Sequence, residues 1–308
     1  MTPLRLTATL VVAAVLILAT WLLLPQAEPD ALPPAIATGF TAAEVSHGEY
    51  VFHLAGCDAC HTDNQNDGAW LAGGKAIDSP FGTFYAPNIT PDPETGIGQW
   101  SLRDFHRSMR HGLSPERRAY FPAFPYLSYS AMADDDIRAL YAYLRTAPAV
   151  RQDNREHDLD WYVLRSGLKI WRWRYFSPGG HSDADGDEQW RRGNYLATAL
   201  GHCGECHTPR NALGALRHDQ HYRGAAYGED DWAPDISPCE AGLGDWSRRE
   251  LDDFFSDGLL PGDDFVGSVM AAIVEDSLVH LTRVDRQALI HYLRTAPAGL
   301  NCPPSPAD

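Results

Sequence analysis

The chain has 308 residues, which suggests about two domains, and its 44% hydrophobic and 21% charged residues are typical of a globular protein. The formal net charge of −16 argues against a nucleic-acid partner, because phosphates require a basic surface. An acidic surface is compatible with docking on a basic protein, although solubility alone also explains it.

The first predicted element is an apolar run from Leu6 to Leu24 that only three threonines interrupt. A helix of this length can just cross a hydrocarbon core of roughly 30 Å. Arg5 precedes the run, which favours a cytoplasmic N-terminus. The run is longer than a usual signal-peptide core and no clean cleavage site follows it. We therefore predict a retained transmembrane anchor at 1–25 and a proline-rich linker at 26–40.

Four short segments then recur in the same order, at offsets of 146 to 149 residues. The repeated pairs are Cys57–His61 with Cys203–His207, Asn88–Pro91 with Asp235–Pro238, Trp100–Arg103 with Trp246–Arg249, and Tyr143–Ala149 with Tyr292–Ala298. Such a repeat indicates duplication of a unit of about 110 residues. We predict two domains, at 41–149 and 191–302, joined by a helical connector at 150–190.

Each unit is predicted to be mainly helical. Capping-box patterns mark helix starts at Thr41-x-x-Glu44, Ser101-x-x-Asp104 and Ser247-x-x-Glu250. Apolar residues at helical spacing mark the last helix of each unit: Ile137, Leu140, Tyr141 and Leu144, then Leu289, Tyr292 and Leu293. Stretches rich in Gly and Pro, such as 72–99, are predicted to be long loops. Such loops suit a compact domain if they wrap a cofactor that supplies the missing core.

The connector contains an apolar stripe at spacings of three and four, formed by Trp161, Leu164, Leu168, Trp171 and Tyr175. This predicts a helix packed on one of the two domains, and an ordinary amphipathic helix explains the pattern fully. The basic residues of the same segment are Arg165, Lys169, Arg172 and Arg174. They allow a role at a membrane surface, which we treat as the weaker alternative.

Each unit carries a C-x-x-C-H motif, formed by Cys57, Cys60 and His61 in the first and by Cys203, Cys206 and His207 in the second. Two cysteines three positions apart present both sulfurs to one edge of a porphyrin, where each forms a thioether with a vinyl group. The adjacent histidine then reaches the iron as the proximal ligand. The motifs therefore predict two covalently bound haem c groups.

Two other chemistries use similar cysteine pairs. A structural zinc site would want further Cys or His at matching spacing in each unit. A thioredoxin-like redox pair needs a βαβ setting, which a helical, loop-rich unit lacks. Two copies at matching positions of a duplicated, exported unit favour haem attachment over both.

Each iron also needs a distal ligand, and a methionine thioether suits electron transfer. Besides Met1 the chain has Met109, Met132 and Met270. Met270 follows a glycine-rich loop before the last helix, and Met132 occupies the matching place in the first unit. We therefore predict Met132 and Met270 as distal ligands. The alternatives for the first iron are Met109, His53, His106 and His111.

These motifs, together with Gly82–Gly98, Pro122–Tyr126 and Gly201–Asn211, resemble the cytochrome c subunits of membrane-bound bacterial dehydrogenases, such as alcohol and gluconate dehydrogenases. The resemblance extends over about residues 40–300. It implies a mainly α fold of two tandem cytochrome c domains, with class I-like helices around covalent haem. It also implies proximal ligation by His61 and His207, with Met270 as a distal ligand.

Two departures from that family bear on the first site. Its subunits often have three haem units, whereas this chain has two. They often carry Met within the Pro-Ala-x-Pro-Tyr motif, where this chain has Phe124. Relatives with Phe there tend to have Met eight residues later, which is Met132 here.

Cys239 and Cys302 have no counterpart in the first unit. In an oxidising compartment two such cysteines can pair, and a Cys239–Cys302 bridge would tie the C-terminal tail to the second haem loop. The alternative is two unpaired thiols, one of them contacting a partner.

The motifs predict an electron carrier of the bacterial inner membrane, with its haem domains in the periplasm. Its donor would be a dehydrogenase or quinol-oxidising partner, and its acceptor a cytochrome or terminal oxidase of the respiratory chain. The chain would be a non-catalytic electron-transfer protein or the cytochrome subunit of an oxidoreductase complex. The alternative is a dihaem enzyme, such as a peroxidase or thiosulfate dehydrogenase, with an open coordination site at the first haem. A haem-based sensor would need a signalling domain, which the sequence lacks.

Overall fold

The structure is a computed structural model that describes residues 39–179, 186–227, 231–262 and 264–295, together with Cys302 and scattered positions between 7 and 29. The predicted anchor and linker lie for the most part outside these residues. Among the helices that the structure does describe, none has the length and apolar character needed to span a membrane.

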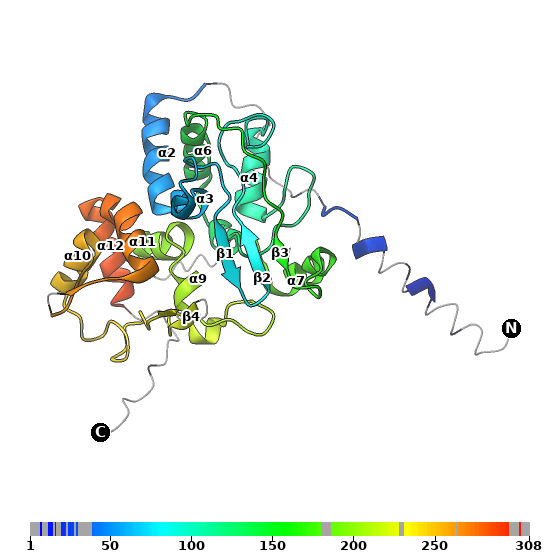
Figure 1. Ribbon diagram of the computed structural model, residues 1–308. Helices are drawn as coiled ribbons and strands as arrows, with labels where there is room; N and C mark the ends of the chain where they lie inside the picture. Colours follow the sequence, from blue (N-terminus) through cyan, green and yellow to red (C-terminus); the bar gives the residue numbers. More distant parts are fainter. Residues whose placement is uncertain are drawn as a thin grey trace.

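The first half is built from helices and a small sheet (Figure 1). Its helical elements are α2 (Ala42–Leu54), α3 (Cys57–His61), the 3-10 turn η1 (Asn64–Asn66), α4 (Leu102–His111), α5 (Tyr126–Tyr129) and α6 (Asp134–Leu144). The sheet has the order β1-β2-β3 and consists of β1 (Ala76–Ser79), β2 (Gly82–Tyr85) and β3 (Asp158–Leu159).

The hairpin β1–β2 corrects the prediction of a loop at 72–99. It pairs Ala76 with Tyr85 and Ser79 with Gly82, antiparallel, and β3 from the connector adds Leu159 opposite Gly82. The glycines and prolines of this stretch concealed a short run of β-branched and aromatic residues, which favour strands. Gly82 has φ +103, and a Cβ there would lie 2.4 Å from the Asp158 carbonyl oxygen, so this position requires glycine.

The connector and the second half follow the same helical plan. Their helical elements are η2 (Arg165–Gly167), α7 (Leu168–Tyr175), α8 (Glu188–Tyr195), the π-helical turn η3 (Leu196–Leu200), α9 (Gly204–His207), η4 (His218–Gln220), α10 (Arg248–Asp257), α11 (Ser268–Asp276), η5 (Leu278–His280) and α12 (Arg283–Leu293). Two antiparallel hairpins are formed by β4 (Ala225–Tyr227) with β5 (Asp231–Ala233) and by β6 (Leu259–Leu260) with β7 (Asp264–Phe265). The prediction of a mainly α fold is confirmed.

The three predicted helix starts are also confirmed. Thr41, Ser101 and Ser247 each accept a hydrogen bond from the backbone N–H three residues on, and the carboxylate at that third position accepts from the backbone N–H of the capping residue. Each box satisfies two N–H groups that a helix start would otherwise leave unpaired.

The first and last helices of each half pack against each other, α2 on α6 and α8 on α12. A glycine permits the close approach in both pairs. A Cβ on Gly48 would lie 1.9 Å from the Ala139 carbonyl oxygen, and one on Gly193 would lie 2.0 Å from that of Ala288. The apolar stripes predicted for the last helices are buried.

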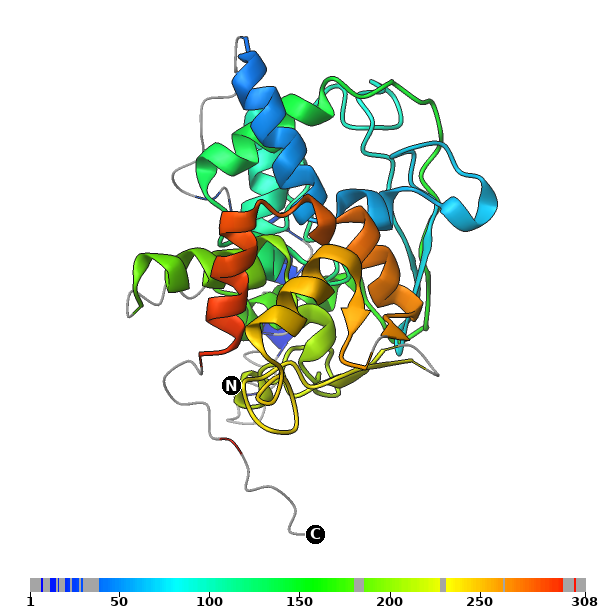
Figure 2. The ribbon, with the colours of Figure 1, turned by 90° about the vertical axis from the view of Figure 1, so that its left-hand side faces the viewer.

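The two halves share one continuous hydrophobic core, which includes Phe52 and Ile137 of the first and Leu251 and Ile290 of the second. Figure 2 looks onto their junction, with the blue α2 above the red α12. His53 of α2 stacks on His280 of η5, with ring centroids 3.6 Å apart. The two halves are therefore packed against each other and are not independent domains joined by a linker.

The connector packs on the first half through Leu168, which belongs to a small second core with Phe84, Leu113 and Phe121. Its helix is shorter than predicted, because the glycine-containing 3-10 turn η2 precedes α7 and glycine has low helix propensity. Trp161 and Leu164 therefore lie before the helix rather than on its buried face, and they are 89% and 64% exposed.

Candidate haem-attachment sites

Each C-x-x-C-H motif forms a short helix directly after the first helix of its half. Gly56, at φ +61, turns the chain from α2 into α3, which begins at Cys57 and ends at His61. In the second half η3 leads to His202, at φ +37, and α9 ends at His207. The first motif thus lies entirely within α3, whereas in the second motif Cys203 is the residue that caps the start of α9.

The two motif histidines form equivalent hydrogen bonds, each to the backbone carbonyl of a proline. Nδ1 of His61 lies 2.7 Å from the Pro87 carbonyl oxygen, and Nδ1 of His207 lies 2.7 Å from that of Pro234. A carbonyl only accepts, so Nδ1 carries the hydrogen and Nε2 keeps its lone pair. Burial lowers the pKa of both histidines, which favours the neutral ring. A fixed, neutral imidazole with Nε2 as lone-pair donor is the form that binds a metal ion.

The loop after each motif is tied back to the motif histidine by a matching backbone hydrogen bond. The backbone N–H groups of Gly73 and Gly224 donate to the carbonyls of His61 and His207, at 2.8 and 2.9 Å. These glycines have φ +78 and +75, and a Cβ on Gly73 would lie 2.5 Å from the Pro87 carbonyl carbon. The repeat therefore preserves, beside each prolyl carbonyl, a backbone arrangement that favours glycine.

The cysteine pairs do not have the character of redox-active thiols. Burial raises the pKa of Cys57 and Cys203 to about 12 and that of Cys206 to about 11. Redox pairs of the thioredoxin type have thiols with lowered pKa values. Within the described ranges, no group of three or more His, Cys, Asp and Glu side chains gathers that could hold a metal ion. The residues present fit thioether attachment of haem.

The attachment segments of the two halves lie side by side around Tyr129. Its hydroxyl donates to the carbonyl of Ala55, two residues before Cys57, at 2.7 Å. Its ring meets that of His202, the neighbour of Cys203, edge to face at 5.4 Å. In Figure 1, α3 and α9 accordingly lie where the two halves meet.

A second contact joins the same segments. The Ser128 hydroxyl donates to Oε1 of Glu205 at 3.0 Å, and Glu205 stands between the two cysteines of the second motif. Sequence reasoning missed Tyr129 and Glu205, because neither has a counterpart in the repeat. It also missed the prolyl carbonyls, although the repeated Ala-Pro before Asn88 and Asp235 was a usable signal.

The predicted distal ligands lie in the shared core. Met132 is 1% exposed and lies in the turn before α6, whereas Met270 is partly buried and lies on α11. Their settings therefore match less closely than the repeat suggested. Met109, on α4, is 5% exposed and belongs to the same core. Burial alone does not choose between Met132 and Met109, and the assignment stays a prediction.

Two of the alternative histidines have structural partners. Nε2 of His106 lies 3.0 Å from Oδ1 of Asp134, and His53, stacked on His280, directs Nδ1 to the Asp276 carbonyl oxygen at 3.3 Å. Burial lowers the pKa of His111 to about 4. The partners of His53 and His106 hold these rings in the packing of the protein, which disfavours these two residues as the first distal ligand.

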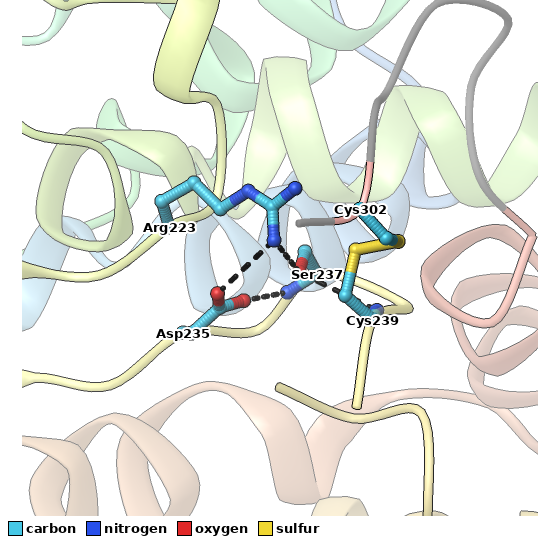
Figure 3. The surroundings of a disulfide bond; sticks show 5 residues. All are labelled: Arg223, Asp235, Ser237, Cys239 and Cys302. Atoms are coloured by element: carbon cyan, nitrogen blue, oxygen red, sulfur yellow. Dashed lines mark hydrogen bonds and ion pairs between the residues drawn. A yellow bond between two sulfur atoms is a disulfide. The ribbon is translucent and has the colours of Figure 1, made fainter. Parts of the chain in front are cut away.

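The two additional cysteines are paired, so the prediction of a bridge is confirmed. Cys239 and Cys302 form a disulfide with their Cα atoms 5.5 Å apart (Figure 3). Beside it, the Ser237 N–H donates to Oδ1 of Asp235 at 2.7 Å, and Arg223 lies 3.5 Å from Oδ2 of the same aspartate. The bridge thus fastens the C-terminal tail to the loop that carries the Pro234 carbonyl.

No family model matches the chain. It is similar to the "Diheme cytochrome c-type" protein of Cereibacter sphaeroides, with 36% identity over 277 residues that cover 88% of this chain and 92% of that protein. It is 37% identical to the fructose dehydrogenase cytochrome subunit of Gluconobacter japonicus, over 89% of this chain and 56% of that subunit. It is 38% identical to the cytochrome c subunit of the quinone-dependent alcohol dehydrogenase of Gluconobacter oxydans, over 83% of this chain and 55% of that subunit. The chain therefore spans nearly all of the first relative and about half of the other two.

Proposed function

Since this chain belongs to the dihaem c-type cytochromes, we propose that it transfers single electrons from a dehydrogenase or quinol-oxidising partner to a respiratory acceptor. The proposal rests on one hydrogen bond that recurs in both halves. Nδ1 of His61 donates to the Pro87 carbonyl, and Nδ1 of His207 donates to the Pro234 carbonyl. This bond prepares one iron ligand in each half of the chain. The names of the dehydrogenase subunits among its relatives support the choice of donor.

Each candidate residue has a defined task in this proposal. Haem c, when bound, supplies a one-electron couple whose potential depends on axial ligands, hydrogen bonds and burial. Cys57, Cys60, Cys203 and Cys206 attach it through thioethers, and His61 and His207 are the proximal ligands. Met132 and Met270 are the distal ligands. The prolyl carbonyls fix the ring orientation and raise the basicity of Nε2.

The packing of the halves supports transfer within one molecule. Tyr129 contacts Ala55 on one side and His202 on the other, so only this one side chain separates the two attachment segments there. An electron received by one half therefore has a short route to the other half through packed protein.

We also propose a location on the periplasmic side of the inner membrane. The apolar run from Leu6 to Leu24 supports a membrane anchor. The Cys239–Cys302 disulfide supports an oxidising compartment, because such bonds persist in exported proteins. The net charge of −16 supports docking on a basic surface of the electron partner.

The proposal is tested on the full chain, produced in a host that matures c-type haem. We expect a haem-staining band after denaturing electrophoresis, a mass increase for two porphyrins and optical and electron paramagnetic resonance spectra of two low-spin haems. Absence of covalent haem, or a mass increase for one porphyrin, would overturn the dihaem assignment. A high-spin signal in the resting protein would favour the enzymatic alternative instead.

The distal ligands are tested by leucine substitutions, which conserve volume and cost little stability, typically below about 1.5 kcal/mol. Met132→Leu and Met270→Leu should each convert one low-spin haem to high spin, whereas Met109→Leu should leave both unchanged. A high-spin signal from Met109→Leu, with an unchanged spectrum for Met132→Leu, would transfer the first assignment to Met109.

A further inference from the structure

The connector exposes large apolar side chains to solvent. Trp161 is 89% and Trp173 is 80% exposed, and their neighbours Tyr162, Leu164 and Ile170 are about half exposed or more. Ile170 and Trp173 lie on one face of α7, while Trp161 packs edge to face against Tyr162 in the preceding turn. Several large apolar side chains exposed within one short segment are typical of a surface that another molecule or a membrane covers.

The same segment is basic in an acidic protein. From Trp161 to Tyr175 it contains Arg165, Lys169, Arg172 and Arg174 and no acidic residue, although the chain as a whole has a net charge of −16. Arg172 is buried beneath the rings of Tyr126 and Phe176. The guanidinium of Arg165 donates to the Ala119 carbonyl and lies over a ring of the first half, whereas Arg174 is exposed. Tryptophans interspersed with exposed cations are typical of segments that lie in the headgroup region of a bilayer.

The end of the N-terminal apolar run contacts this segment. Nζ of Lys169 donates to the carbonyl oxygens of Trp21 and Leu24, at 2.6 and 3.3 Å, and lies 4.5 Å from the centre of the Trp21 ring. The Gln26 N–H donates to the Arg117 carbonyl of the first half at 3.1 Å. In Figure 1, α7 lies on the side of the molecule from which the blue N-terminal segments extend. A membrane crossed by that run would therefore begin beside α7.

We infer that the exposed face of residues 161–174 lies on a phospholipid bilayer. Trp161 and Trp173 are its interfacial anchors, and Arg174 binds anionic headgroups. The inference rests on the proposed N-terminal anchor and adds a second contact that fixes how the haem domains lie over the membrane. The contact between Lys169 and the end of the anchor favours lipid over a protein partner, since it brings the membrane to this face before any partner binds.

The test uses the full-length, haem-loaded protein in nanodiscs of phosphatidylcholine and phosphatidylglycerol, with no other protein present. Hydroxyl-radical footprinting with mass spectrometry compares Trp161 and Trp173 with Trp232, which lies on β5 and is 66% exposed. We expect severalfold less oxidation at Trp161 and Trp173 than at Trp232, despite their greater exposure to solvent. Equal oxidation would overturn the inference, and so would protection that arises only when a dehydrogenase is added.

The outcome separates the two proposals. A chain that does not co-purify with nanodiscs overturns the anchor and, with it, the lipid contact. A chain that co-purifies but leaves both tryptophans reactive overturns the lipid contact alone. As a matched comparison, the double variant Trp161→Ala/Trp173→Ala should lower labelling of segment 161–174 by a photoreactive lipid severalfold, whereas Trp232→Ala should not. Equal labelling in both variants, with unchanged haem spectra, would overturn the role of the two tryptophans.

Discussion

The Tyr50 hydroxyl of the first half donates a 2.5 Å hydrogen bond to Oδ2 of Asp285 in the second half. The equivalent tyrosine of the second half, Tyr195, donates in the same way to Asp136 of the first. Each aspartate lies in the first turn of the last helix of its half. The junction thus contains two contacts related by the internal repeat, in which each half provides one hydroxyl and receives another.

Removal of these hydroxyls should loosen the junction. We expect Tyr50→Phe and Tyr195→Phe each to lower the free energy of unfolding by about 1–3 kcal/mol, because a hydrogen bond to a charged, largely buried carboxylate is lost. Denaturant titration of the haem-loaded protein measures the change. Tyr162→Phe is the control, since Tyr162 is 51% exposed and bonds to Asp160 within the connector. If all three variants had the same free energy of unfolding as the wild type, the two tyrosine–aspartate hydrogen bonds would contribute nothing to stability.

The glycines between paired helices should not tolerate a methyl group. We expect Gly48→Ala and Gly193→Ala each to destabilise the fold by about 1–3 kcal/mol or more, since the added Cβ would overlap a backbone carbonyl of the partner helix. Gly167→Ala is the matched control, because no atom lies within 4 Å of its added Cβ. There we expect no loss, and up to about 1 kcal/mol of gain from a stiffer unfolded chain. Thermal unfolding distinguishes these cases, and a stable Gly48→Ala variant would contradict the close approach.

Ionisation of Asp285 should make the free energy of unfolding depend on pH. Burial raises its pKa, but hydrogen bonds from Arg192 and Tyr50 outweigh burial, so the pKa lies below the ordinary value of 3.8. A lowered pKa means that the folded state favours the carboxylate. Its stabilisation is therefore complete above 3.8 and is lost as the pH falls below that value towards the folded-state pKa.

The measurement compares the free energy of unfolding of the wild type and of Asp285→Asn as a function of pH. The two curves should be apart at neutral pH and should converge at acidic pH, because only the wild type loses this charge. Other acidic groups with lowered pKa values, such as Asp104, titrate in both proteins and cancel in the difference. Parallel curves throughout the acidic range would refute the assignment.

The disulfide should contribute much of the stability of the second half. Cys239 and Cys302 are 63 positions apart, and closing a loop of this length corresponds to about 4 kcal/mol in the chain-entropy estimate. We expect Cys239→Ser/Cys302→Ser to lower the stability by up to this amount. In the denatured, haem-loaded wild type, a maleimide should label the two cysteines only after reduction. Labelling without a reductant would disprove the bridge.

Features encoded by local spacing could be predicted from the sequence. The capping boxes at Thr41, Ser101 and Ser247 and the apolar stripes of the last helices depend only on neighbours along the chain. The pairing of Cys239 with Cys302 followed from their number and the expected compartment. The hairpin at 76–85 was missed, because turn-forming residues surround its few strand-forming ones.

Contacts between the halves could not be predicted in this way. Tyr129 touches both attachment segments because the halves dock at one particular angle, and no spacing within either half records that angle. The same holds for Tyr50 and Asp285, which are 235 residues apart. Trp161 and Leu164 fit a helical stripe by spacing, yet the turn at Arg165–Gly167 separates them from the helix.

Paired contacts across a twofold axis are the hallmark of a symmetric dimer, in which every substitution appears twice. Here both copies belong to one chain, so each contact can change without its twin. The partners of the two aspartates already differ: Asp136 lies against the imidazole of His47, while Asp285 is bound by the guanidinium of Arg192. Because the two copies are fused, the surroundings of Asp136 and of Asp285 can diverge independently.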